Sequence, residues 1–145
     1  MLTVFAGACA HSHAAPTVTA ARIVLVMLPA ESDAFPDVAK AATSSFAQVK
    51  LTGVDETVTS KVSMEVVQLS IECVDASASC YEAAAKSLTA NKLLFASIES
   101  EGKKPKIAIT IYDAATKQPR TKERTFDTEA AAIAGVNALV TEATR

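Results

Sequence analysis

The chain has 145 residues, 50% of them hydrophobic, and a formal net charge of -2. This length is enough for one domain whose hydrophobic core forms without a structural metal. Fourteen basic residues against sixteen acidic ones leave no excess of positive charge, so we expect no nucleic-acid partner. The low aromatic content and the lack of tryptophan also argue against a surface that stacks bases.

The start of the chain differs from the rest. Residues 2–8 (LTVFAGA) are apolar and end in small residues, as in the tail of an export signal, although the usual basic region before them is missing. This run is too short to span a bilayer, which needs about 20 apolar residues. We predict a signal remnant and linker over residues 1–21 and a single domain over residues 22–145.

The run ends in Ala6-Gly7-Ala8-Cys9, which resembles the lipobox of bacterial lipoproteins, where the cysteine becomes the lipidated N-terminus. Ala6 stands in the place of the usual leucine. The same small residues also fit ordinary signal cleavage, and an unprocessed N-terminus is a third reading. We carry lipidation of Cys9 forward as a hypothesis, with the other two readings left open.

With Cys9 lipidated, Cys73 and Cys80 remain as an even pair, and we predict that they form a disulfide. The six residues between them are small or polar, and closing so short a loop is worth roughly 2.5 kcal/mol. A zinc site needs further ligands, but both histidines, His11 and His13, lie in the leader. A redox role for Cys80 is not supported, because the cysteine is not part of a C-x-x-C motif. We therefore expect neither a metal site nor a cofactor.

The first half of the domain begins with a strand. Residues 23–28 (IVLVML) form an apolar run before Pro29, which predicts a strand buried on both faces. A helix should follow, capped by Ser32 or Asp33, with Pro36 in its first turn. We expect a short second strand over residues 49–54 and favour a helix over residues 62–71. The apolar positions of the first helix are Phe35, Val38, Ala39, Ala42, Phe46 and Val49.

The second half begins with a predicted capping box from Ser79 to Glu82 and a helix that ends at Asn91. Residues 93–99 and the alternating isoleucines after Gly102 predict a β-hairpin, and the charged residues 121–126 predict a solvated edge strand. Asp127 or Thr128 should cap a last helix whose core face holds Ile133, Val136, Leu139 and Val140. The sum is an α/β (α+β) domain with a mixed sheet of about 4–5 strands, in the order β-α-(β)-α-α-β-β-β-α.

Several strings in this order are similar to the TolB N-terminal and curli-secretion-like group of bacterial envelope domains. They are VLVMLP (24–29), QLSIEC (68–73), the helix and strand over 80–97, and ITIYDAAT (109–116), within a similarity over about residues 22–143. This chain departs from the group at Glu72 and at Ala96 or Ser97, where glycine is usual. The resemblance implies a mixed sheet with helices packed against it, in an envelope protein that binds other proteins. Together with the leader and the cysteine pair, it leads us to expect a periplasmic protein that a lipid on Cys9 anchors to the outer membrane, or else a secreted one, with no other membrane contact. It implies no catalytic residues.

Enzyme chemistry finds little support in the residues. Mechanisms of the Ser-His-Asp or Cys-His type need a histidine in the folded body, and none follows His13. No nucleotide-binding glycine loop occurs. Acidic side chains could still converge for glycan hydrolysis, or be caps and loop residues. We expect a non-catalytic protein-binding domain, with a small-molecule or glycan-binding domain, including a carboxylate-type hydrolase, as the alternative. The acids in question are Asp33, Asp37, Asp55, Glu56 and Asp75.

Overall fold

The computed structural model describes residue 15 and residues 20–145. The strands are β1 (Val24–Met27), β2 (Glu56–Thr59), β3 (Lys92–Glu101), β4 (Lys104–Asp113) and β5 (Gln118–Thr125). The helices are α1 (Pro36–Phe46), α2 (Met64–Ser70), α3 (Ala78–Ser87) and α4 (Glu129–Ala143). The predicted class and element order are confirmed. Among the described residues, no helix is long and apolar enough to cross a membrane.

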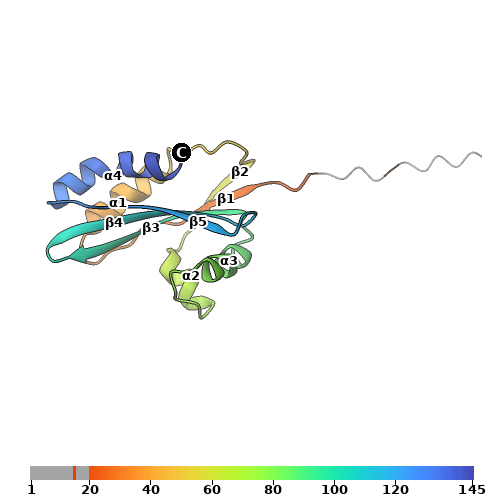
Figure 1. The fold of residues 1–145 in the computed structure, drawn as a ribbon, viewed down its shortest axis with the longest axis horizontal. Helices are drawn as coiled ribbons and strands as arrows, with labels where there is room; N and C mark the ends of the chain where they lie inside the picture. Colours follow the sequence, from red (N-terminus) through yellow and green to blue (C-terminus); the bar gives the residue numbers. More distant parts are fainter. Residues whose placement is uncertain (1–14, 16–19) are drawn as a thin grey trace, which may run out of the picture.

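The five strands form one mixed sheet in the order β2-β1-β3-β4-β5. Strand β1 pairs in parallel with both β2 and β3, whereas β3, β4 and β5 form an antiparallel meander. Helices α1 and α4 cover one face of this sheet and α2 and α3 the other (Figure 1). The sheet is therefore the middle layer of three.

Strand β1 lies at the meeting point of two hydrophobic clusters. Leu25 and Met27 pack into the cluster that α1 and α4 complete, whereas Val26 and Leu28 pack into the one that α2 and α3 complete. Successive side chains of a strand point to opposite faces, so a strand between two helical layers must be apolar throughout. This is why the run of residues 23–28 shows no alternation.

The meander is fixed by alternation and by an ion pair. Ile107, Ile109 and Ile111 of β4 point into the α1–α4 cluster. At the open end of the β3–β4 hairpin, Lys92 contacts Asp113 across the registered pair of strands. Burial alone would raise the pKa of Asp113, but the hydrogen bond from Lys92 and two backbone amides outweigh it and lower the pKa. The carboxylate is thus held ionised.

Two predicted boundaries at the start of elements are wrong. The second strand begins at Glu56, because residues 49–54 form a loop whose apolar side chains Val49, Leu51 and Val54 pack on the α1–α4 cluster. Helix α3 is capped by Ser77 rather than Ser79, since the Ser77 hydroxyl accepts a hydrogen bond of 3.3 Å from the amide of Cys80.

The ends of two helices also differ from expectation. The left-handed residue after α3 is Thr89, with φ 53°, and Asn91 instead accepts a 2.8 Å hydrogen bond from the amide of Val24. Thr128 caps α4 as predicted, but Ile133 is 41% exposed and Ala132 takes the core position. A side chain at Gly135 would meet the ring of Phe126 at 2.4 Å, so glycine is needed where α4 packs on that ring.

One buried polar group lacks a partner. Tyr112 is fully buried against Tyr81, with ring centroids 6.1 Å apart, and its hydroxyl makes no hydrogen bond to the described residues. A buried hydroxyl without a partner costs about 1–3 kcal/mol.

The substitution Tyr112→Phe should therefore raise the free energy of unfolding by about 1 kcal/mol, measured by urea denaturation. Tyr81→Phe is the control and should change it little; a loss of stability in Tyr112→Phe would contradict the assignment.

Candidate functional site

Helix α2 is apolar on its outer side as well as its inner side. Met64 and Val67 are buried in the core, while Val66 is 42% exposed and Leu69 is 67% exposed. Val62, at 40%, and Val74, at 67%, extend this surface on either side of the helix. We call these four residues, Val62, Val66, Leu69 and Val74, the α2 patch. A surface helix normally carries polar residues outward, so such a patch indicates a contact site.

The patch is held in place by the loop between α2 and α3. Cys73 and Cys80 form a disulfide in the structure, with Cα atoms 5.6 Å apart, which joins the end of α2 to the first turn of α3. Gln68 strengthens this link, because its carbonyl accepts from the amide of Cys73 at 3.0 Å and its side chain donates to the carbonyl of Asp75 at 3.1 Å. Val74 is thereby fixed beside α2.

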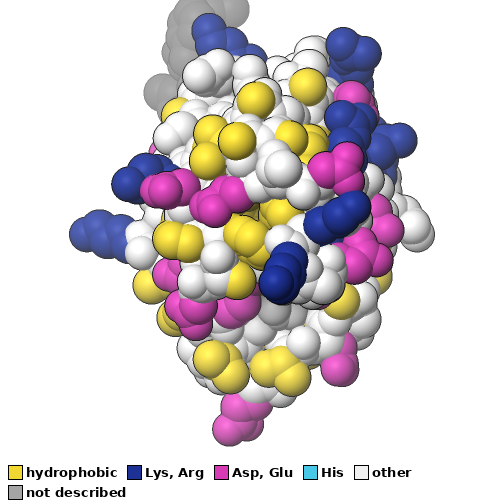
Figure 2. Space-filling model, turned by 90° about the vertical axis from the view of Figure 1, so that its left-hand side faces the viewer, with side chains coloured by type: hydrophobic (Ala, Val, Ile, Leu, Met, Phe, Trp, Pro, Cys, Tyr) yellow, Lys and Arg dark blue, Asp and Glu magenta, His cyan; other side chains and the backbone are white. Residues whose placement is uncertain are grey.

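The surroundings of the patch are acidic. Between Lys61 and Lys86 the sequence contains Glu65, Glu72, Asp75 and Glu82 and no lysine, arginine or histidine. Glu82 is neutralised by Lys86 at 3.0 Å and Lys117 at 3.5 Å, and the hydrogen bond from Lys86 is the main cause of its lowered pKa. The other three acids form no ion pair with any described residue. In Figure 2 the lowest part of the molecule, where α2 and α3 lie in Figure 1, shows hydrophobic and acidic side chains and no lysine or arginine.

The five acids considered for glycan hydrolysis do not come together. Asp33 and Asp37 follow the carboxyl end of β1, whereas Asp55 and Glu56 lie at the opposite end of the parallel pair of β1 and β2. Asp55 accepts a 2.7 Å hydrogen bond from the amide of Ile23, and Glu56 forms an ion pair of 3.3 Å with Arg22. Asp75 lies in the disulfide loop. The five acids are thus divided among three places in the fold and do not form one carboxylate site.

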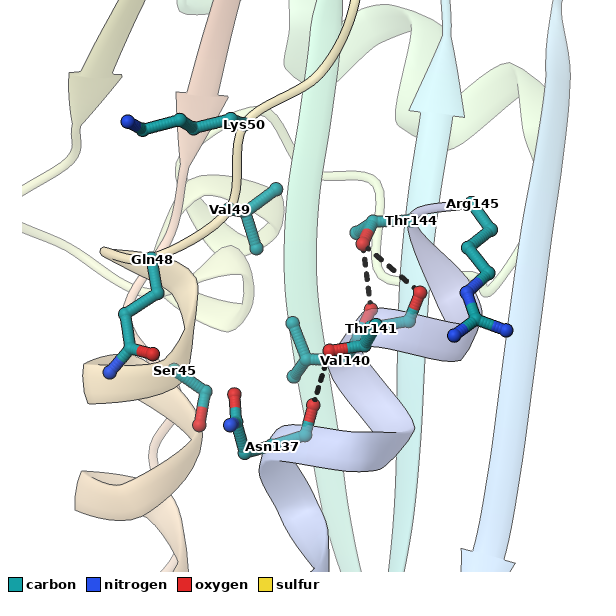
Figure 3. A pocket seen from close by; sticks show the side chains of 9 residues that line it. All are labelled: Ser45, Gln48, Val49, Lys50, Asn137, Val140, Thr141, Thr144 and Arg145. Atoms are coloured by element: carbon teal, nitrogen blue, oxygen red, sulfur yellow. Dashed lines mark hydrogen bonds between the residues drawn. The ribbon is translucent and has the colours of Figure 1, made fainter.

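A cavity of about 480 Å³ lies between the carboxyl ends of α1 and α4 (Figure 3). Three hydroxyls in its lining are committed to the backbone: that of Ser45 donates to the carbonyl of Ala41 at 2.9 Å, that of Thr141 to Asn137 at 3.0 Å, and that of Thr144 to Val140 at 2.9 Å. Figure 3 shows Lys50 directed away from α4, and Ser45 and Asn137 directed toward each other. The cavity holds none of the five acids.

The residues considered for lipidation and for metal binding lie at the start of the chain. Within residue 15 and residues 20–145, no group of three or more His, Cys, Asp and Glu side chains could hold a metal ion. Cys9, His11 and His13 lie outside the described residues. Lipidation of Cys9 therefore stays a prediction.

Comparison with known proteins leaves the function open. No family model and no curated protein matches the chain. Similar solved structures include the LpoB C-terminal domain from Salmonella enterica, with 15% identity, a TM-score of 0.43, and coverage of 79% of this chain and 88% of that one. The same domain from Escherichia coli has 13% identity, a TM-score of 0.41 and coverage of 73% and 83%. The competence damage-inducible protein A (ComA) from Klebsiella pneumoniae has 15% identity, a TM-score of 0.43 and coverage of 83% of each chain.

These similarities are too low to carry a conclusion about function. The TolB N-terminal and curli-secretion-like group is not among these structures, so that resemblance is not confirmed. What the chain itself offers as a candidate site is the α2 patch. The sequence contains a signal for this patch, because residues 62, 66 and 69 are apolar at helical spacing, next to the apolar core positions 64 and 67. Periodicity alone does not show which of the two sets faces solvent.

The disulfide gives the first test of how the patch is held. The double substitution Cys73→Ala with Cys80→Ala should lower the free energy of unfolding by roughly 2–3 kcal/mol, because the unfolded chain regains the freedom of the closed loop. Urea denaturation of the oxidised protein with and without a reductant measures the same quantity in the unmodified chain. Amide hydrogen exchange should rise over α2 and the loop and stay unchanged in β4. Equal stability of the oxidised and reduced forms would contradict this role.

Proposed function

We propose that the chain is a non-catalytic domain of the bacterial cell envelope that acts by binding another envelope protein through the α2 patch. The observation that carries the proposal is the exposure of four large apolar side chains: one just before a short helix, two on it and one in the disulfide-bonded loop that follows. Exposed apolar groups of this kind are covered when a protein partner binds. A structural disulfide fits an oxidising compartment such as the periplasm.

The charges around the patch define the chemistry of the partner. Glu65, Glu72 and Asp75 form no ion pair with described residues, and they alternate along the chain with the apolar residues of the patch. A complementary surface presents apolar side chains for the centre and lysine or arginine for the rim. The expected partner is therefore an envelope protein whose docking segment is both apolar and basic. Rim charges of this kind mainly raise the association rate, and the apolar centre supplies most of the affinity.

Exposed apolar side chains elsewhere provide a matched control. Leu69→Ser should weaken binding about tenfold or more, since truncating a central apolar contact costs about 1–2 kcal/mol. Ile133→Ser, which alters an isolated exposed side chain on α4, should leave binding unchanged. The partner is first found by a photo-reactive residue at position 74 in the native host, then purified, and its dissociation constant is measured by calorimetry.

Charge reversal separates the rim from the centre. Glu72→Lys should slow association and flatten its dependence on salt, whereas Glu129→Lys, on α4 at the opposite face of the sheet, should do neither. Capture of a protein whose affinity is equal for the wild type, Leu69→Ser and Ile133→Ser would overturn the proposal.

We also propose that Cys9 is the lipid attachment site that anchors the domain to the envelope. The support is the order Ala6-Gly7-Ala8-Cys9 after an apolar run, together with the even cysteine pair that remains. A mass spectrum of the protein from its native host should show an N-terminus at Cys9 that carries acyl chains. The substitution Cys9→Ser should release the protein from the membrane fraction. An intact Met1 together with free thiols at Cys73 and Cys80 would contradict export altogether.

A further inference from the structure

One edge of the sheet is open for pairing. Strand β2 is the outer neighbour of β1, and all four of its residues are exposed. The amides of Glu56 and Ser60 donate to the carbonyls of Ile23 and Met27 in β1, at 3.2 and 2.8 Å. Because backbone groups alternate in direction along a strand, the amides and carbonyls of Thr57 and Thr59 point outward. No described residue pairs with them.

The opposite edge is protected in a way that β2 is not. Strand β5 carries Arg120, Lys122, Glu123 and Arg124, and Arg124 is tied to Glu142 of α4 at 3.2 Å. Charged residues on an edge strand discourage pairing with other chains. Strand β2 has one charge, Glu56, which Arg22 neutralises at 3.3 Å. Its sequence, ETVT, is otherwise made of residues that favour strands.

We propose that a second copy of this chain pairs with β2, antiparallel and across a two-fold axis, so that the sheet continues from one protomer into the other. The strand is complementary to itself. In the register centred on Val58, Thr57 of one copy exchanges hydrogen bonds with Thr59 of the other, and Glu56 faces Ser60. No like charges are opposed, and Val58, which is 40% exposed, meets its own counterpart.

The register follows from the outward groups. In a symmetric pair, each outward-facing residue must face another outward-facing one, which places the axis on a single residue rather than between two. Val58 is the choice that overlaps residues 56–60 completely. Val66, Leu69 and Val74 of the α2 patch lie outside this register, and the substitutions that test docking differ from those that test the dimer, so either proposal can fail without the other.

Opposite charges at the centre of symmetry give the sharpest test. The full chain carrying Cys9→Ser, which excludes intermolecular disulfides through that residue, should dimerise in sedimentation equilibrium with a dissociation constant below roughly 1 mM. Val58→Glu and Val58→Lys should each weaken association at least tenfold, because like charges then face each other across the axis. An equimolar mixture of the two should restore a dimer. Ile133→Glu, on α4 and with a nearly equal exposure of 41%, should leave association unchanged.

A backbone substitution tests the hydrogen bonds themselves. Thr57→Pro removes one outward-facing amide, which an edge strand tolerates, and should abolish the dimer while circular dichroism and the melting temperature stay close to the wild type. Thr57→Val keeps the amide and should keep the dimer. A wild-type chain that stays monomeric up to about 1 mM overturns the proposal, and so does a mixture of Val58→Glu and Val58→Lys that fails to associate.

Discussion

The burial of β1 from both sides is the constraint on which the rest of this structure depends. Its four residues alternate between two hydrophobic clusters, and neither set is covered unless a helical layer lies on each face of the sheet. The parallel neighbours β2 and β3 complete its hydrogen bonds. A long connection is needed between parallel strands, and these connections supply α1 on one face and α2 with α3 on the other.

The two helical layers are unequal, and the difference explains the candidate site. Helix α4 has 15 residues and packs along α1, whereas α2 has seven and contributes only Met64 and Val67 to the core. An isolated helix of that length is unstable in water, so its position depends on those two contacts and on the disulfide that follows. Packing of Met64 and Val67 into the core sets which side faces outward, and the disulfide holds the end of the helix in that position. Val66 and Leu69 are therefore held in a solvent-exposed position.

The charges are distributed in the same unequal manner. The net charge of -2 conceals an acidic end around α2 and a mixed, mostly basic strand at β5. Self-pairing of edge β5 is opposed by its charges, and β2 is left as the edge where backbone groups are accessible. One surface thus offers apolar side chains with acidic neighbours, and another offers backbone hydrogen bonds with almost no charge. Each suits a different kind of contact.

The sequence by itself determined the class of fold and the order of its elements. The signals it uses are local: apolar runs, the alternation from Ile107 to Ile111, and the caps before helices. Such signals can be recognised without any knowledge of tertiary contacts. The disulfide between Cys73 and Cys80 could likewise be predicted, since the six residues between them are small or polar and form a short loop easily. The predicted boundaries are wrong where a contact distant in sequence outweighs the local preference for strand or helix. Residues 49–54 form a loop that packs on the core, and the side chain of Asn91 accepts a hydrogen bond from the amide of Val24.

Which faces point outward was decided only by the tertiary structure. On α2, residues 66 and 69 and residues 64 and 67 are both apolar at helical spacing, and packing against α3 and the sheet decides which pair is buried. The same holds for α4, where Ala132 rather than Ile133 packs into the core beside Val136. Convergence of acids is also a long-range property, and the parallel pairing of β1 and β2 separates Asp33 from Asp55. Periodicity describes what a segment can bury; only the packed neighbours decide what it does bury.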